Sequence, residues 1–326
     1  MIITRTPLRI SIGGGGTDLP SYYSRYGGFV IAVTISKYVY ITLHQTFQKN
    51  FLIKYSQMET VGDVDQIKHP IIREALKMHG VEPFIEMISM ADLPAGTGLG
   101  SSGAFTVGLL RAIYSWKRQP ATPQVIAEEA CHIEMELLKQ PIGKQDQYMS
   151  SFGGFTCLSI DQTGKADVTP LKLSADTIYD LEDNLLMFFT GFSRNAGNVL
   201  EDQKKRTEKE DPAMIENLHF IKETGLSIKK ALEAGRTEEF AGLMHLHWLH
   251  KKKRSSGISN DQINGWYDIG FANGALGGKL IGAGGGGFLL FYAHDRQKLR
   301  LAMARAGLAE VRFHFDYEGS RILVRD

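Results

Sequence analysis

Small residues and paired serines crowd one short segment of the chain, PAGTGLGSSG, which runs from Pro94 to Gly103. A strand pattern, PFIEMISMADLP, precedes the segment, and a helical pattern, SSGAFTVGLLRAIYSWKR, follows it. The amides of a glycine loop and of a helix N-terminus can bind an anion without a cationic side chain. The segment therefore predicts a phosphate-binding loop, in which Ser101 or Ser102 can offer a hydroxyl to Mg²⁺. The alternative is an ordinary helix with a serine N-cap.

An earlier glycine cluster, IGGGGTDLP, lies at the end of the first strand pattern and spans Ile12 to Pro20. Four glycines permit positive φ angles and let a ligand approach bare backbone, and Asp18 offers a carboxylate to hydroxyl donors. Alternation along the preceding strand can direct Arg9 toward the same pocket. A glycine turn with an Asx cap, next to a surface arginine, is the purely structural alternative.

Two carboxylates follow the phosphate-loop candidate. Thr122 and Pro123 begin a helix, which Pro141 must end, and Glu134 lies on its apolar face. That apolar face comprises Ile126, Ala130, Ile133, Leu137 and Leu138. Asp146, in PIGKQDQYMSSFGG, lies at a loop-to-helix transition. Its position fits a catalytic carboxylate and equally the first residue of a short capped helix.

A third glycine cluster, IGAGGGGF, contains a GxGxxG match from Gly282 to Gly287. A dinucleotide site would need a helix to begin inside this motif. The segment FLLFYA follows instead, and its pattern is that of a strand. We therefore expect a strand-to-strand loop of bare backbone, which can pack beside the phosphate loop.

The remaining patterns divide the chain into two units. The first 60 residues alternate and predict strands of one antiparallel sheet. From about residue 183, strands alternate with polar helices between 198 and 254 and a helix around 263–276, and the end of the chain adds two strand-like pieces. A boundary between 165 and 182, placed at 175, gives two domains in contact, 1–175 and 176–326.

The composition of the 326 residues is that of an ordinary globular protein, with 43% apolar and 22% charged residues. With 37 basic and 36 acidic residues, no global field favours nucleic acid or an anionic membrane. Cys131 and Cys157 lack metal-ligand spacing, so we predict that both are buried thiols. Free thiols fit a reducing compartment. No run approaches the roughly 18 apolar residues of a membrane span. We expect a cytoplasmic protein without nucleic-acid or membrane partners. A homodimer is possible, but the sequence does not determine the oligomeric state.

Taken together, PLRISIGGGGTDLP, PAGTGLGSSG, the segment from Glu134 to Asp146 and KLIGAGGGGFLLF resemble the motifs of the GHMP small-molecule kinases. They occur in that family's order and cover the chain from end to end. The resemblance implies a two-domain α+β fold, with an N-terminal domain like ribosomal protein S5 and a ferredoxin-like C-terminal domain. It also implies ATP phosphates on the second motif and an acceptor between the domains.

The resemblance implies a role for each matching residue. Asp146 matches the catalytic aspartate, Arg9 the arginine that assists it, Glu134 and Ser102 the ligands of Mg²⁺, and Asp18 the aspartate that holds sugar hydroxyls. The residues that match the ATP-binding motif are Pro94, Gly96, Gly98, Leu99, Gly100, Ser101, Ser102 and Gly103.

More narrowly, GGGGTDLPSYY, GKQDQY, TGFSRNAG, HWLHKKKRSSGIS and GGKLIGAGGGGF resemble the D-glycero-D-manno-heptose 7-phosphate kinases, which phosphorylate the anomeric hydroxyl in nucleotide-activated heptose biosynthesis. L-fucose kinases share the glycine-rich opening, whereas galactokinases carry a Glu-His pair where Gly15 and Gly16 stand here. A sugar phosphate calls for local cations. The predicted substrate-binding residues are Gly15, Gly16, Thr17, Asp18, Lys144, Arg194 and Lys251.

Two further alternatives stay open. The KKKR segment that contains Lys251 also fits a basic helix C-terminus, which the helix dipole favours. A non-catalytic protein that binds a nucleotide or a sugar on a kinase fold is the alternative from another functional class, and the intact Glu134, Asp146 and serine pair argue against it.

Overall fold

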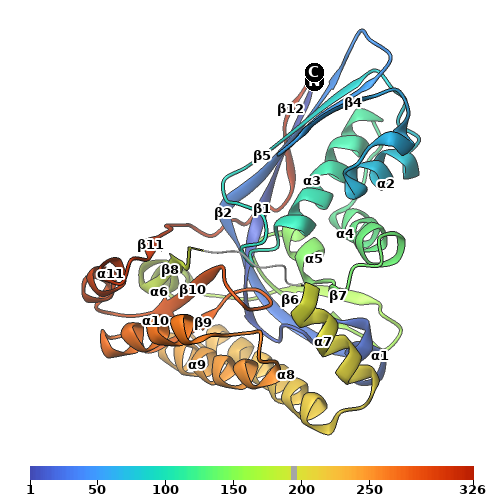
Figure 1. The fold of residues 1–326 in the computed structure, drawn as a ribbon. Helices are drawn as coiled ribbons and strands as arrows, with labels where there is room; N and C mark the ends of the chain where they lie inside the picture. The colour runs from blue at the N-terminus through green and yellow to red at the C-terminus, as the bar shows by residue number, and fades with distance from the viewer. Residues whose placement is uncertain (192–196) are drawn as a thin grey trace.

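The computed structural model describes residues 1–191 and 197–326, and Figure 1 shows its helices arranged around two β-sheets. The larger sheet has eight strands in the order β12-β1-β2-β5-β3-β4, with β6 paired to β2 and β7 paired to β6. These strands are β1 (Ile2–Gly13), β2 (Gly28–Gln45), β3 (Phe51–Lys54), β4 (Met58–Val61), β5 (Ile85–Ala91), β6 (Phe155–Ile160), β7 (Ala166–Pro170) and β12 (Arg321–Arg325).

The smaller sheet is antiparallel and has the order β11-β8-β10-β9. Its strands are β8 (Leu185–Phe189), β9 (Gly277–Leu280), β10 (Phe288–Tyr292) and β11 (Ala309–Glu310). The third glycine cluster joins β9 to β10, so the predicted strand-to-strand loop is confirmed. A dinucleotide-binding helix is therefore absent from this position.

The helices cover both sheets (Figure 1). They are α1 (Pro20–Tyr26), η1 (Val64–Gln66), α2 (Pro70–Met78), α3 (Ser101–Trp116), α4 (Pro123–Cys131), η2 (His132–Leu137), α5 (Gln145–Phe152), α6 (Ala175–Asn184), α7 (Gly197–Glu208), α8 (Pro212–Glu233), α9 (Thr237–Arg254), α10 (Asp261–Ala272) and α11 (Arg296–Arg305). Helices α2, α4 and α5 pack around α3 on the larger sheet, while α9 packs against β9.

Helix α3 lies unusually close to β1. A Cβ atom at Gly108 would lie 2.8 Å from the hydroxyl oxygen of Thr6, and the hydroxyl of Thr4 donates to the carbonyl of Gly108 at 3.0 Å. The main-chain amide of Arg9 also donates to the carbonyl of Leu99 at 3.0 Å. The contacts of Gly108 hold the middle of α3 against the first half of β1. The bond from Arg9 to Leu99 places the N-terminus of α3 near the first glycine cluster.

The helix that carries Glu134 begins as predicted, because the hydroxyl of Thr122 accepts from the amide of Val125 at 3.3 Å. After Cys131 the chain continues as a π-helix, η2. Glu134 is fully buried, in agreement with its predicted inward face. Leu137, predicted on the same face, is instead 43% exposed, because the wider π turn changes the angular spacing of the following residues.

Two expectations about the strands need correction. Strand β3 pairs with β5 in parallel, because β5 inserts between β2 and β3, which run in opposite directions. The end of the chain forms one regular strand, β12, and Phe315 makes only an isolated bridge to Ile35. Strand β12 pairs with β1, so the last residues of the predicted range 176–326 complete the larger sheet. The division at residue 175 itself stays a prediction.

The two sheets share one hydrophobic core. Ile12 and Ile31 of the larger sheet belong to the same buried cluster as Met244 of α9 and Leu290 of β10. Helix α8 passes so close to β1 that a Cβ atom at Gly13 would lie 3.0 Å from the Cα of Gly225. Cys131 and Cys157 are free and buried, as expected. Among the helices in the described ranges, none is long and apolar enough to cross a membrane.

Candidate active site

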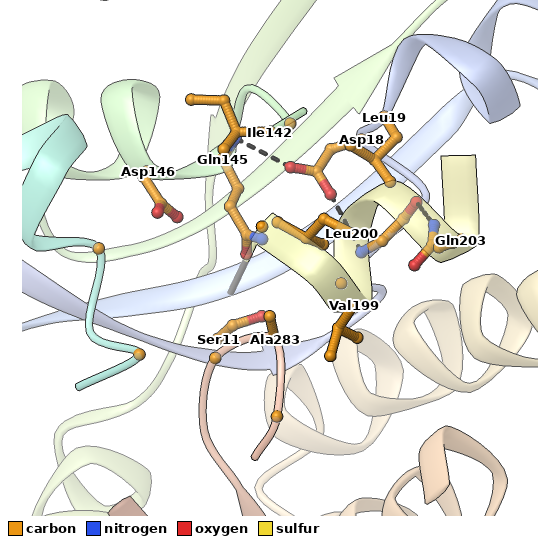
Figure 2. A pocket seen from close by; sticks show the side chains of 18 of the residues that line it. Ser11, Asp18, Leu19, Ile142, Gln145, Asp146, Val199, Leu200, Gln203 and Ala283 are labelled. Atoms are coloured by element: carbon orange, nitrogen blue, oxygen red, sulfur yellow. Dashed lines mark hydrogen bonds between the residues drawn. The ribbon is translucent and has the colours of Figure 1, made fainter. Parts of the chain in front are cut away.

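A cavity of about 750 Å³ opens between the two sheets and is lined by all three glycine clusters. Figure 2 shows Asp18 and Asp146 on its walls, with Gln145 between them and residues of α7 beside Asp18. Loops at strand ends that meet a helix N-terminus are frequent places for ligand sites, and the volume suits a small substrate.

The predicted phosphate loop lines one wall. Gly96, Gly98 and Gly100 have φ angles of 77°, 85° and 75°, which only glycine adopts readily, and Gly100 is the N-cap of α3. The cavity-lining residues of this segment are Gly96, Gly98, Gly100, Ser101 and Ser102. The first amides of α3 therefore lie at the cavity and can bind an anion.

The other three predicted residues of this loop lie outside the cavity lining and support its shape. Leu99 is fully buried in the core. The carbonyl of Pro94 accepts from the hydroxyl of Thr97 at 3.0 Å. A Cβ atom at Gly103 would lie 2.7 Å from the Cβ of Asp146, so glycine here allows α5 to approach α3.

Ser102 and Glu134 meet at the N-terminus of α3. The hydroxyl of Ser102 donates to Glu134 Oε2 at 2.5 Å, and the side-chain amide of Gln147 donates to Oε1 at 2.8 Å. Burial raises the pKa of Glu134, and the charge of Asp146 raises it further. The serine hydroxyl and the carboxylate offer hard oxygen ligands of the kind that Mg²⁺ prefers. Glu134 has no cationic partner among the described residues. The donor set thus fits a magnesium ion.

Asp146 lies in the first turn of α5 and is paired with Arg9 of β1. Arg9 Nε donates to Asp146 Oδ1 at 2.8 Å, and Arg9 Nη2 lies 2.6 Å from the same oxygen. Arg9 Nη1 also donates to the carbonyl of Gly98 at 2.6 Å. The guanidinium is only 4% exposed, whereas the Asp146 side chain is 27% exposed. The buried arginine therefore holds an accessible carboxylate beside the phosphate loop.

Asp18 closes the cavity on the side of the first glycine cluster. Its carboxylate accepts from the amide of Gly16 at 3.0 Å and from the amide of Gln145 at 3.1 Å (Figure 2). Asp18 is 1% exposed. Burial raises its pKa, although the two amide hydrogen bonds oppose this rise. Gly15 and Gly16 line the cavity, whereas Thr17 is fully buried and its hydroxyl donates to main-chain carbonyls.

The loop between β9 and β10 packs directly on the phosphate loop, as the sequence predicted. A Cβ atom at Gly282 would lie 2.4 Å from the Cα of Gly98, and one at Gly287 would lie 2.2 Å from the carbonyl oxygen of Thr97. Only glycine fits such backbone-to-backbone contacts. The third cluster therefore determines how the phosphate loop is held against the second sheet.

The three residues predicted to bind the substrate phosphate lie in different places in the structure. Lys251 lies on the inward face of α9 and lines the cavity, where its ammonium donates to the carbonyls of Leu280 and Gly282. Lys144 is not brought to the cavity, because its ammonium binds the carbonyl of Gly164 and lies 5.5 Å from the ring centroid of Tyr23. Arg194 lies outside the described residues.

Sequence reasoning missed several residues of the cavity. Arg254 and Lys279 line it and are 5% and 2% exposed, and His247 is 1% exposed. Arg254 stands three positions after Lys251 and therefore on the same helical face, a signal that the KKKR segment contained. Lys279 lies in β9, two positions before the third glycine cluster, but nothing local distinguishes it from a surface lysine of a strand.

Comparisons with known proteins agree with this geometry. Residues 67–154 match the family described as GHMP kinases N terminal domain, and residues 228–309 match GHMP kinases C terminal. The chain belongs to the GHMP kinase family, and it is a phosphotransferase that uses ATP and an alcohol acceptor, within the sugar-kinase group. The expected two-domain α+β fold of this family is confirmed.

Among its relatives, the D-glycero-alpha-D-manno-heptose 7-phosphate kinase of Campylobacter jejuni is 31% identical over 93% of this chain and 92% of its own length. The bifunctional fucokinase/GDP-fucose pyrophosphorylase of Arabidopsis thaliana is 25% identical over 90% of this chain, but over only 30% of its own length. The crystal structure of a D-glycero-D-manno-heptose 1-phosphate kinase from Bacteroides thetaiotaomicron superposes with a TM-score of 0.82, at 26% identity and full coverage of both chains.

Proposed function

We propose that this kinase transfers the γ-phosphoryl group of ATP to the anomeric hydroxyl of D-glycero-D-manno-heptose 7-phosphate, giving the 1,7-bisphosphate and ADP. The observation that carries the proposal is the pairing of Arg9 with Asp146 and of Ser102 with Glu134 at one helix N-terminus. Arg9, Asp146 and Ser102 line a cavity that also contains buried cations, and Glu134 is buried behind Ser102. The similarity to the Campylobacter jejuni enzyme supports this choice of sugar.

The chain's own residues can carry out the transfer by alignment and charge stabilisation. The amides of the phosphate loop that line the cavity, between residues 96 and 102, bind the phosphates of ATP. Asp146 accepts the proton of the acceptor hydroxyl as its oxygen bonds to the γ-phosphorus, and the bond from that phosphorus to the β–γ bridging oxygen breaks. Arg9 holds Asp146 in place. Mg²⁺, held by Ser102 and Glu134, would neutralise charge on the phosphates.

The acceptor is tested by a coupled assay for ADP release with heptose 7-phosphate, fucose, galactose and mannose. We expect the highest kcat/KM with heptose 7-phosphate. A higher value with fucose would instead place the protein with the fucose kinases. No ADP release with any acceptor, together with measurable ATP binding, would contradict heptose phosphorylation and favour a binding protein.

Asp18→Asn tests the proposed contact with sugar hydroxyls. We expect the KM of the acceptor to rise about 10-fold or more, because a charged acceptor of hydrogen bonds is lost, while kcat changes less. Steady-state kinetics at saturating ATP measure both constants. An unchanged acceptor KM would exclude Asp18 from the sugar contact.

Glu134→Gln tests the proposed magnesium ligand. The amide keeps the size of the side chain but loses its charge, so the Mg²⁺ concentration for half-maximal activity should rise about 10-fold or more. Thermal melting gives a second readout. Because folding raises the pKa of Glu134, the wild-type protein loses folding stability as the pH rises above the unfolded pKa of this carboxyl group. Glu134→Gln should therefore melt at or above the wild-type temperature at pH 8, and any difference between the two melting temperatures should become smaller toward pH 4. An unchanged Mg²⁺ requirement would remove Glu134 from the site.

A further inference from the structure

Three cationic side chains come together in the cavity, near Asp18. Lys251 and Arg254 come from α9 and Lys279 from β9, and their residues are 5%, 5% and 2% exposed. His247, one turn before Lys251 on α9, is 1% exposed. We call these four residues the buried cation cluster. All four line the cavity rather than the protein surface.

Much of the hydrogen-bonding capacity of the cluster is unused. Within the described residues, neither ring nitrogen of His247 has a partner, and Arg254 Nη2 is buried without one. The ammonium of Lys279 makes no hydrogen bond or ion pair with any described residue. Buried polar groups of native proteins are normally paired, so unpaired donors aimed at a cavity indicate a ligand.

The charges of the cluster are also poorly balanced. Burial lowers the pKa of Lys279 to about 7, with Arg254 and Arg9 adding to this shift, and burial together with the neighbouring cations lowers the pKa of Lys251. Asp18 is the acidic group that acts on Arg254, while Asp146 is already paired with Arg9. Three cations facing one carboxylate leave an excess of two positive charges when all are ionised. A phosphate monoester, with a charge of about −1.5 to −2 at pH 7, matches this excess.

The position of the cluster assigns the anion to the acceptor. Arg254 Nη1 donates to the carbonyl of Gly15 at 3.2 Å and to Gln203 Oε1 at 3.0 Å. Gln203 in turn donates to the carbonyl of Gly16 at 2.8 Å. These bonds attach Arg254 to the first glycine cluster, beside Asp18, while Lys251 is bonded to the carbonyls of Leu280 and Gly282. The ATP phosphates already have the amides of the second glycine cluster.

On the basis of the proposed function, we propose that Lys279, Arg254 and Lys251 form a subsite for the phosphate group that the sugar acceptor already carries. Arg254 offers the planar fork suited to phosphate oxygens, and the lysines add point charges. His247 can donate from one ring nitrogen. The subsite would select phosphorylated over unphosphorylated sugars, because an acceptor without phosphate leaves the cluster unpaired.

Lys279→Met tests the subsite, with Lys253→Met as the matched control. Lys253 is an exposed lysine of the same basic segment of α9. In Lys279→Met we expect the KM of heptose 7-phosphate to rise about 10- to 100-fold and the KM of ATP to change less than about threefold. The kcat/KM ratio between heptose 7-phosphate and unphosphorylated heptose should fall by the same factor. Lys253→Met should leave all these values near wild type.

Thermal melting separates this effect from misfolding. Because methionine removes a buried cation without a partner, the Lys279→Met variant should melt at or above the wild-type temperature in the absence of ligand. Loss of sugar-phosphate affinity in a protein of undiminished stability supports the subsite. An unchanged KM for heptose 7-phosphate overturns it, and so does an equal loss for both sugars. A rise confined to the KM of ATP also overturns it, because the anion would then be a phosphate of ATP.

A second measurement does not depend on the identity of the sugar. With ADP and Mg²⁺ at saturation to occupy the nucleotide site, inorganic phosphate is titrated by calorimetry into the wild type and both variants. Binding to the wild type and to Lys253→Met, but at least 10-fold weaker binding to Lys279→Met, supports the subsite even if heptose 7-phosphate proves not to be the acceptor. Equal binding to all three proteins, or none to the wild type, overturns it.

Discussion

Replacing Asp146 by asparagine is expected to lower kcat by at least about 100-fold, with little change in the dissociation constant of ATP. A general base contributes about 10² to 10⁴ in rate, and asparagine keeps the size of the side chain while losing the ability to accept the proton. Arg9 also loses the charge of its partner, so the melting temperature should fall modestly. Single-turnover ADP formation measures the chemical step, and calorimetric titration of ATP measures binding.

Asp176→Asn is the matched control for this experiment. Asp176 lies in the first turn of α6, as Asp146 does in α5, but it is exposed and does not line the cavity. The Asp176→Asn variant loses an acidic group near a helix N-terminus, which should lower the free energy of unfolding by about 0.3–1 kcal/mol. Near-normal kcat in Asp146→Asn would refute the assignment of the base. A similar loss of kcat in both variants would attribute the effect to helix stability.

The second large effect is expected from Gly282→Ala, at the contact between the phosphate loop and the loop from β9 to β10. A methyl group at this position would lie 2.4 Å from the Cα of Gly98, and the φ angle of Gly282 is +79°. Overpacking costs about 1–3 kcal/mol, and the left-handed conformation about 1–2 kcal/mol more. Displacement of Gly98 should also lower kcat/KM for ATP at least about 10-fold. Chemical denaturation and initial-rate kinetics measure the two effects.

Gly307→Ala separates the two contributions. Gly307 has a φ angle of +84°, close to that of Gly282, but an added Cβ atom would meet no heavy atom within 4 Å. This control should therefore lose only the about 1–2 kcal/mol of the backbone conformation and retain its kinetics for ATP. If Gly282→Ala lost no more stability than Gly307→Ala and kept its ATP kinetics, the tight contact between the two loops would contribute neither to stability nor to the use of ATP.

The sequence was most informative where a local rule decides the structure. The helix start at Thr122, the helix after the phosphate loop and the strand after the third glycine cluster were all predicted from signals within about ten residues. The buried face of Glu134 followed from helical periodicity, and it held even though the π turn exposed Leu137. The parallel pairing of β3 with β5 was missed, because pairing depends on which strand inserts between two others.

By itself, the sequence determined the three glycine loops, the order of the family's motifs and the carboxylates offered to them, because backbone conformation and side-chain type are local properties. Only the tertiary structure decided which cations reach the cavity. Lys144 turned toward Gly164, while Lys279 and Arg254 were brought inward by the packing of β9 on α9. The contact of Arg254 with Gly15 spans 239 positions of the chain, so no local pattern could specify it.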